Sequence, residues 1–407
     1  MQEIGIGIIG AGFSADLHAS SLHRIAGRLR NVSVKVVGVA SRNKDRAQAF
    51  AKKNNIPFAY TDYHSLLERD EISVIDICVP NHLHKSLAIE AAQAGKHIIC
   101  EKPLTGYFGE NFEGPEEFVS SSVSKLEMLK KASRNAQEMV NAARSNNVKL
   151  MYAENWIYAP AIEKAKRLIK ASGGTLFEIR AEESHSGSHS KYSKQWKYSG
   201  GGSLMRLGAH PIGAAIHLKN CEGLMRDGKP IRVKSVIATT GNLTKISSFV
   251  KEPKKWVVSD WEDVEDWGTA ILTFADGSKA TVITSDCVLG GVRNKLEICL
   301  SNAYISCNMS PNTCCEVFAP DERVFQDEYI TEKTETKAGW SFPSPDEDWV
   351  RGYPQEMEDF IESVVLNRDP ISDADLARQV VEVIYASYLS AEERSEVELA
   401  NVLSGKV

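Results

Sequence analysis

The sequence predicts a two-domain α/β protein, in which an N-terminal domain built on a parallel sheet precedes a C-terminal α+β domain with an open, mainly antiparallel sheet. Strand-like and helix-like patterns alternate over residues 1–152, as they do in parallel sheets with crossover helices. Over residues 153–407, strand patterns follow one another with few helices between them, which is typical of antiparallel or mixed sheets. The length of 407 residues suits two such domains.

Short apolar segments and amphipathic segments define the elements expected in the N-terminal domain. Strands are predicted at Ile4–Ile9, Val34–Ala40, Val74–Val79, His97–Cys100 and Val148–Ala153. Helices are predicted at Asp45–Asn54, His64–Arg69, His84–Ala94 and Lys125–Ser145, and a glycine-rich start leads into another helix within Gly10–Arg30. The polar stretch Gly106–Ser124 is predicted to be an inserted surface loop.

The C-terminal domain is expected to begin with a helix at Ala161–Lys170 and to end with helices at Gln355–Leu366 and Asp373–Glu393. Strands are predicted between them at Leu176–Glu183, Ile231–Thr239, Thr269–Phe274, Lys279–Ser285, Lys295–Leu300 and Ala303–Asn308. Asp276-Gly277 separates two of these strands, and this dipeptide is a strong hairpin signal.

Composition limits the classes of partner and location. The chain is 43% hydrophobic and 25% charged with a net charge of -6, so no basic field favours nucleic acid or anionic lipid. Its apolar runs, such as Val74–Pro80, are far shorter than the ~20 residues of a membrane span. The N-terminus lacks the features of a signal peptide, and the eight cysteines form no C-x-x-C pair. We expect reduced thiols, no membrane or nucleic-acid partner and a cytoplasmic location.

A glycine-rich segment directly follows the first predicted strand and opens a helix. Gly10 permits a tight turn, Gly12 lets the backbone approach a pyrophosphate, and Ala15 allows close packing of the helix on the strand. Amides of the first helical turn, from Phe13, Ser14 and Ala15, would bind the phosphates. The alternative is a glycine turn without a ligand, but the strand before and the helix after favour a dinucleotide site.

The end of the second predicted strand bears on the choice of dinucleotide. NAD sites usually carry an acid there for the ribose 2′-hydroxyl, but this chain has Ser41, Arg42 and, further on, Arg46. These side chains could hold a 2′-phosphate by charge-assisted hydrogen bonds. The alternative is a solvated basic helix start. The pattern favours NADP and leaves NAD open.

Two further segments follow buried strands, at the sheet edge where ligands bind in such domains. The first supplies Pro80, Asn81 and His84, and the second supplies Glu101 and Lys102. We expect all five residues at the cofactor site. A lysine beside a nicotinamide ring can hold a substrate hydroxyl and serve in proton transfer.

The combination of Gly10–Ala15, Pro80–His84 and Glu101–Pro103 resembles the glucose–fructose oxidoreductase / inositol dehydrogenase / MocA-type (Gfo/Idh/MocA) family over nearly the whole chain. The resemblance implies a Rossmann NAD(P)-binding domain over 1–152 and a substrate-binding and oligomerisation domain over 153–407. It also implies hydride transfer between nicotinamide and a hydroxyl-bearing carbon of a sugar, polyol or sugar acid, in a homodimer or homotetramer.

The resemblance extends into the second domain. Asn155 and Tyr158 match the family's crossover segment, and Gly200–His210 matches its glycine-rich helix start. This implies that Asn155 and Tyr158 contact substrate and that Lys102 and His210 are catalytic. The family's Asp four residues before the histidine is replaced by Arg206, however, and Gly213 stands where an acid is often found.

Arg206 changes the substrate expected. A spacing of four would place Arg206 and His210 on one helix face. Arginine cannot act as a base, but it can hold a carboxylate, sulfonate or phosphate in bidentate fashion, so an anionic, sugar-like substrate is expected. The alternative is a structural ion pair between Arg206 and an acid such as Glu154 or Glu183.

A histidine-rich loop follows the strand Leu176–Glu183. Its polar and aromatic side chains suit a polyhydroxylated substrate, and we expect substrate contacts from His185, His189, Tyr192 and Trp196. A metal at His185, His189 and Glu183 is disfavoured because neither a helical H-x-x-x-H frame nor a cysteine pair supports it. A polar loop without a ligand is the other alternative. Four other histidines are expected to be structural: His18, His23, His64 and His217.

Two other function classes fit the same residues. One is a redox-neutral glycoside-cleaving enzyme that retains its NAD(H), oxidises a sugar hydroxyl transiently and eliminates the glycosidic substituent. The other is a non-catalytic sensor that binds a dinucleotide. The presence of both Lys102 and His210 argues against the sensor.

Overall fold

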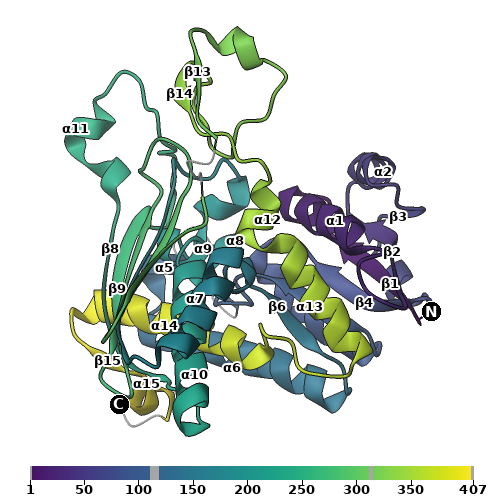
Figure 1. Cartoon of the computed structure of the whole chain (residues 1–407), viewed down its shortest axis with the longest axis horizontal. Helices are drawn as coiled ribbons and strands as arrows, with labels where there is room; N and C mark the ends of the chain where they lie inside the picture. The colour runs from purple at the N-terminus through teal and green to yellow at the C-terminus, as the bar shows by residue number, and fades with distance from the viewer. Residues whose placement is uncertain (1, 111–118, 311–314, 405–407) are drawn as a thin grey trace. The chain divides into compact units, whose positions relative to one another are not determined.

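The computed structural model describes residues 2–110, 119–310 and 315–404 (Figure 1). The chain divides into two compact units. Unit 1 comprises Met1–Gly106, Lys131–Tyr158 and Gly352–Val381, and unit 2 comprises Tyr107–Lys130, Ala159–Arg351 and Glu382–Val407. No signal in the sequence indicated that the chain returns to the first unit after residue 352.

Unit 1 contains a six-stranded parallel sheet. Its strands are β1 (Gln2–Ile9), β2 (Val32–Ala40), β3 (Phe58–Tyr60), β4 (Ile72–Ile77), β5 (His97–Glu101) and β6 (Leu150–Ala153). The strand order is β3-β2-β1-β4-β5-β6, which is the order of the Rossmann fold. The predicted parallel sheet is confirmed. Only β3 was not expected, because three residues are too few for a periodic signal.

The helices of unit 1 follow the predicted pattern, and one further helix comes from the C-terminal part of the chain. They include α1 (Phe13–Ile25), α2 (Lys44–Lys53), α3 (His64–Leu67), α4 (His84–Gln93) and most of α6 (Lys125–Ser145). A late helix, α13 (Tyr353–Val365), begins after Gly352 in a left-handed conformation with proline in its first turn, a favourable helix start. Met357, Phe360 and Ile361 on α13 are buried, and α13 packs against α1.

Unit 2 is built on a seven-stranded mixed sheet. Its strands are β7 (Leu176–Ser184), β8 (Val233–Gly241), β9 (Trp267–Phe274), β10 (Lys279–Ser285), β11 (Arg293–Leu300), β12 (Tyr304–Asn308) and β15 (Val397–Glu398), in the order β12-β11-β7-β10-β9-β8-β15. Only the β7–β10 pair is parallel, so the predicted open, mainly antiparallel sheet is confirmed. The predicted Asp276-Gly277 hairpin joins β9 to β10, with Gly277 at φ 89°.

Helices cover one face of this sheet. The main ones are α7 (Pro160–Ser172), α9 (Ser203–Arg206) and α10 (Ala209–Asp227), and α9 and α10 contact β9, β10 and β7. Strands β13 (Val317–Ala319) and β14 (Gly339–Ser341) pair antiparallel in a separate two-stranded sheet. The predicted loop Gly106–Ser124 falls partly on residues 111–118, which lie outside the described residues, and its end forms the short helix α5 (Val119–Ser122). Among the described helices, none has the length and apolar character to cross a membrane.

Candidate active site

The glycine-rich segment lies between β1 and α1, at the carboxyl edge of the unit 1 sheet. Gly10 has φ +121°, and a Cβ at this position would lie 2.0 Å from the Cys78 carbonyl oxygen. A Cβ on Gly12 would meet no atom within 4 Å, so open space faces its backbone. Gly12 provides no side-chain cap for α1, while Ala15 is fully buried. The segment therefore has the close strand contact, the open approach and the uncapped helix start that a pyrophosphate site needs.

The tip of β2 presents two exposed arginines. Arg42 and Arg46 are both exposed, and Ser41 donates its amide to the Tyr60 carbonyl at 3.0 Å. Asn43 caps α2 by accepting from the Arg46 amide at 2.9 Å, which fixes the start of the helix that carries Arg46. Both guanidinium groups are thus accessible beside the end of β2.

His84 connects the two segments that follow β4 and β5. Its Nδ1 lies 3.0 Å from the Pro103 carbonyl oxygen, and its Nε2 lies 2.9 Å from the Val79 carbonyl oxygen. Burial lowers the pKa of His84 despite these contacts. Its fully buried ring holds the Lys102–Pro103 segment next to the end of β4, whereas Pro80 and Asn81 are partly exposed in the same region.

Lys102 is placed by its neighbour Glu101. The Lys102 amide donates to Glu101 Oε2 at 2.9 Å. Because β1, β4 and β5 are parallel neighbours in the sheet, Lys102 and the glycine-rich segment lie at the same sheet edge. Three sequence-predicted groups of unit 1, after β1, β4 and β5, are therefore brought together.

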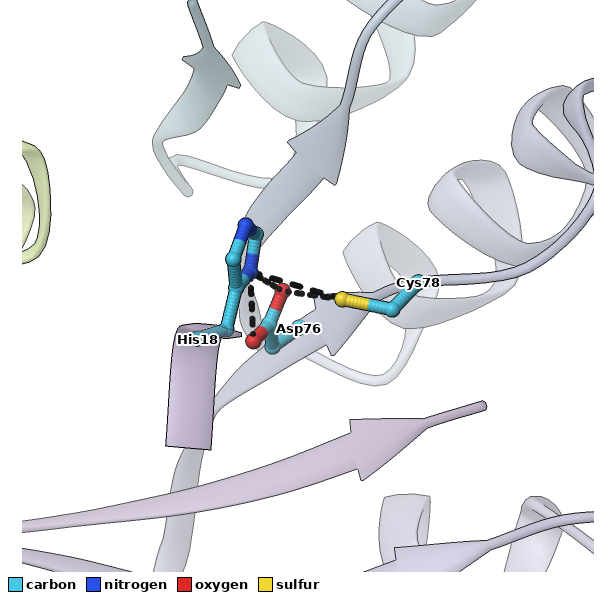
Figure 2. Close-up of side chains that lie close together, drawn as sticks. All are labelled: His18, Asp76 and Cys78. Atoms are coloured by element: carbon cyan, nitrogen blue, oxygen red, sulfur yellow. Dashed lines mark hydrogen bonds and ion pairs between the residues drawn. The ribbon is translucent and has the colours of Figure 1, made fainter. Parts of the chain in front are cut away.

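A buried polar cluster lies beneath this edge (Figure 2). It contains His18 from α1, Asp76 from β4 and Cys78, which follows β4. Their ligand-type atoms all lie within 4.8 Å of one another, so a metal has to be considered. The closest contacts are those of hydrogen bonds, however: His18 Nδ1 lies 3.0 Å from both Asp76 oxygens, and the Cys78 thiol donates to Asp76 Oδ1 at 3.4 Å. Hydrogen bonding accounts for the geometry of the cluster.

In unit 2, the glycine-rich segment before His210 is anchored by Glu265. The Gly202 and Leu204 amides donate to the Glu265 carboxylate, each at 2.9 Å, and the Tyr388 hydroxyl donates to it at 2.7 Å. Burial raises the pKa of Glu265 to about 7, although these donors act in the opposite direction. Glu265 thereby fixes the turn that leads into α9 and α10.

The expectation that Arg206 and His210 share one helix face is wrong. Arg206 ends α9, and His210 lies in the first turn of the separate helix α10. Pro211 explains the interruption, because proline lacks an amide proton and is tolerated only in the first turn of a helix. His210 itself is 5% exposed.

Arg206 is engaged by an acid that the sequence did not indicate. Its guanidinium forms an ion pair with Asp286 and lies 4.7 Å from the centre of the Trp261 ring. Asp286 is fully buried, and burial raises its pKa while Arg206 opposes that rise. The structural ion pair considered for Arg206 exists, and the structure shows Asp286 as a partner in it.

The predicted substrate-binding residues differ widely in accessibility. His185 is buried and lies 3.7 Å from Asp286 Oδ1, whereas His189 is exposed and Tyr192 is 43% exposed. Trp196 is 2% exposed, and its indole donates to the Tyr107 carbonyl at 3.0 Å. A ring this buried offers no face to a sugar, so Tyr192 is the accessible aromatic side chain of this loop.

Asn155 and Tyr158 lie in unit 1, on the 3-10 helix Asn155–Tyr158. Both are buried. The Tyr158 hydroxyl donates to Asp359 at 2.7 Å and accepts the Ser372 amide at 2.9 Å. Within unit 1, this hydroxyl fastens the 3-10 helix to the returning segment that contains Asp359 and Ser372.

Two family models and several known oxidoreductases match parts of this chain. Residues 4–119 match the model of an oxidoreductase family with an NAD-binding Rossmann fold, and residues 162–306 match the GFO/IDH/MocA C-terminal domain. The levoglucosan dehydrogenase of Pseudarthrobacter phenanthrenivorans is 28% identical over 227 residues, which cover 54% of this chain and 52% of that enzyme. The trans-1,2-dihydrobenzene-1,2-diol dehydrogenase of Mus musculus is 32% identical over 200 residues, covering 49% and 52%. The chain thus matches about half the length of these curated relatives.

Solved structures show the same fold over almost the whole length. GenD2 from gentamicin A biosynthesis, in complex with NAD, has a TM-score of 0.75 at 22% identity and covers 98% of this chain and 97% of its own. Levoglucosan dehydrogenase in complex with NADH and levoglucosan has a TM-score of 0.71 at 21% identity and covers 98% and 100%. Together with the two matched family models, which cover residues 4–119 and 162–306, these findings show that the chain belongs to the GFO/IDH/MocA oxidoreductase family.

Proposed function

We propose that this protein is an NAD(P)-dependent oxidoreductase that moves hydride between nicotinamide and a hydroxyl-bearing carbon of a sugar- or polyol-like substrate. The observation that carries the proposal is the shared sheet edge in unit 1, where the open glycine segment follows β1 and Lys102 follows β5, the two parallel strands on either side of β4. The relatives named levoglucosan dehydrogenase and dihydrobenzenediol dehydrogenase support a substrate with ring hydroxyl groups.

In this proposal, one side chain holds the reacting oxygen of the substrate and a second side chain moves its proton. The dinucleotide, when bound, supplies the hydride acceptor or donor. Lys102 holds the substrate oxygen, and His210 accepts the hydroxyl proton as the C–H bond delivers its hydride. In the reverse direction, His210 returns a proton to the oxygen of the ketone.

The ion pair between Arg206 and Asp286 bears on the substrate's charge. Asp286 already neutralises the guanidinium, so the anionic substrate anticipated from Arg206 loses its main support. We propose a neutral polyhydroxylated substrate instead. Arg206→Ala should then reduce kcat/KM for neutral sugars and for sugar acids to the same extent. A rise in KM confined to acidic substrates would restore the anionic hypothesis.

One assay with two readouts tests the proposed reaction. The protein would meet neutral sugars, polyols, sugar acids and aryl glycosides with NAD or NADP, while nicotinamide absorbance and aglycone release are followed together. Stoichiometric reduction of the dinucleotide is the expected result. Aglycone release without net reduction would establish the redox-neutral glycosidase instead. Dinucleotide binding without turnover of any substrate would establish the sensor.

We propose NADP as the preferred dinucleotide, on the basis of exposed Arg42 and Arg46 at the tip of β2. Arg42→Ala should lower kcat/KM with NADP by about tenfold or more, as expected for a charge-assisted hydrogen bond, and should change the value with NAD little. Lys52→Ala, an exposed lysine in the last turn of α2, is the matched control. Equal effects of Arg42→Ala on both dinucleotides would contradict the preference.

We also propose a homo-oligomer formed through the outer face of the unit 2 sheet. One face is covered by α9 and α10, whereas the other exposes Ile237, Ile271 and Ile283 by 40–48%. Ile237 and Ile271 are paired across β8 and β9, so they form a continuous apolar area.

We also propose a cytoplasmic location for the protein. The free thiols of the described cysteines suit a reducing compartment.

A further inference from the structure

The buried cluster around His18 has a second side that faces Glu101. His18 is fully buried on α1, with Nδ1 directed at Asp76, as Figure 2 shows. Its other ring nitrogen, Nε2, lies 3.1 Å from Glu101 Oε1 in an ion pair that is not oriented as a hydrogen bond. Each nitrogen of one imidazole ring therefore lies close to a carboxylate oxygen, at 3.0 Å from Asp76 and 3.1 Å from Glu101.

This arrangement suits an imidazolium better than a neutral ring. A neutral imidazole has one N–H and one lone pair, so one of its two nitrogens would place a lone pair close to a carboxylate oxygen. Without a cation, the fully buried Asp76 carboxylate and the largely buried Glu101 carboxylate would also be strongly destabilising. Burial is the largest single influence and lowers the pKa of His18, but the charge and hydrogen bond of Asp76, together with the interactions of Cys78, hold this pKa well above 6.5.

Glu101 links this cation to Lys102. One Glu101 oxygen faces His18 Nε2, and the other accepts the Lys102 amide at 2.9 Å. We propose that His18, as a buried imidazolium between Asp76 and Glu101, is a positioning residue that fixes the Glu101 carboxylate and thereby sets the backbone of Lys102. The proposal rests on the oxidoreductase function proposed above and assigns it a residue that touches neither substrate nor dinucleotide.

Three other ionisable groups near Asp76 and Glu101 are largely uncharged, so none of the three replaces the His18 imidazolium as the cation that offsets these two carboxylates. Cys78 lies 3.4 Å from Nδ1, and burial raises the pKa of its thiol, so it is uncharged. From α13, the fully buried Glu356 interacts electrostatically with His18. Burial raises the pKa of Glu356 well above 4.5, so it adds little negative charge. From β6, the Tyr152 hydroxyl is buried with a raised pKa and is also neutral.

Two variants separate positioning from simple structural support. His18→Gln removes the charge and should lower kcat/KM at every pH by roughly 10- to 100-fold, the effect expected of a small misplacement of a catalytic group, with dinucleotide affinity nearly unchanged. Asp76→Asn keeps the imidazole but lowers its pKa. This variant should retain activity near about pH 6 and lose it as pH rises to about 8, because the imidazolium then deprotonates.

His217→Gln is the matched control. His217 is a buried histidine of α10 in unit 2, and burial lowers its pKa to about 3, so it is neutral. Its replacement should leave the shape of the pH profile unchanged even if stability falls. If Asp76→Asn gives the wild-type pH profile, or if folded His18→Gln keeps wild-type activity, His18 does not position Lys102.

A spectroscopic measurement on the whole protein needs no substrate and therefore stands even if the proposed reaction fails. With ¹⁵N-labelled histidine, both ring nitrogens of His18 should show the imidazolium pattern up to about pH 8. The Lys102 amide resonance should shift in His18→Gln and remain in place in His217→Gln. A single N–H on His18 at that pH, an unmoved Lys102 amide, or one equivalent of bound metal that is lost in His18→Gln would overturn the proposal.

Discussion

Gly10 and Gly12 are two residues apart in one loop, but their backbone conformations and surroundings differ. Gly10 has a positive φ, and a side chain there would collide with the Cys78 carbonyl oxygen. Gly12 has an ordinary φ of -107° and open space beside it. The first glycine therefore serves the fold, and in our proposal the second leaves space for the dinucleotide.

Two alanine substitutions separate these roles. Gly12→Ala should fold with nearly unchanged unfolding free energy but bind NAD(P) at least tenfold more weakly, because the methyl group would occupy the space for the pyrophosphate. Gly10→Ala should destabilise the protein by roughly 2–4 kcal/mol because of strain and a backbone clash. Denaturant titration and dinucleotide fluorescence would measure both effects. Wild-type dinucleotide affinity in Gly12→Ala would contradict the assigned site.

Site residues could be predicted from the sequence where a local motif defines them. The glycine segment and Lys102 follow strands in a recognisable order, and the structure places them at one sheet edge. Asp286 could not be found in this way, because it lies 80 residues from Arg206 and belongs to no motif. His18 was expected to be structural, since the sequence does not reveal that Asp76 and Glu101 lie on opposite sides of its ring.

Among the elements, the turn from Gly200 to Leu204 depends on a distant acid rather than on its own hydrogen bonds. Glu265 precedes β9 and accepts two amides of this turn. A Cβ on Gly202 would lie 1.9 Å from the Glu265 carbonyl oxygen, so the backbone of the turn packs directly on the Glu265 backbone. The position of α9 and of the start of α10 follows from this contact.

The raised pKa of Glu265 predicts a specific pH dependence of stability. Because its pKa is about 7 in the folded protein and about 4.5 when unfolded, the folded state binds the proton more tightly. Its contribution is fully present below pH 4.5 and is lost as pH rises through 7. Relative to wild type, Glu265→Gln should therefore gain unfolding free energy over this range, on the order of a few kcal/mol.

Urea unfolding at several pH values would measure that difference. Glu262→Gln, an exposed carboxyl three residues earlier, is the control and should track wild type at every pH. A constant difference between Glu265→Gln and wild type from pH 4.5 to 7 would show that Glu265 does not titrate in this range.

Long periodic elements were predictable, and short or interrupted ones were not. The helix predicted at Lys125–Ser145 and the strand predicted at Lys279–Ser285 have the observed bounds. The strands β3 and β15 are too short to show alternation, since their pairing comes from neighbouring strands. The interruption between α9 and α10 does not follow from the spacing of Arg206 and His210, because it depends on Pro211, which is tolerated only in the first turn of a helix.

At the scale of the whole molecule, the outer face of the unit 2 sheet governs assembly in our proposal. Ile271→Lys would place a charge at the centre of the exposed apolar area on β9. The variant should sediment as a monomer while retaining its fold, because its side chain already faces solvent in the single chain. Leu366→Lys, a similarly exposed apolar position in unit 1, should leave the oligomer intact. A monomeric wild-type protein would contradict the proposal.

The division of unit 1 into separate segments has a consequence for the order of events during synthesis. Residues 352–381 belong to unit 1, and the apolar face of α13 packs against α1. A ribosome must therefore translate the chain through α13, more than 300 residues beyond α1, before α1 acquires this neighbour. Until then, the nascent N-terminal half exposes apolar surface that chaperones recognise. Truncation before residue 352, which would spare the motifs of the first 150 residues, should still leave unit 1 incompletely folded.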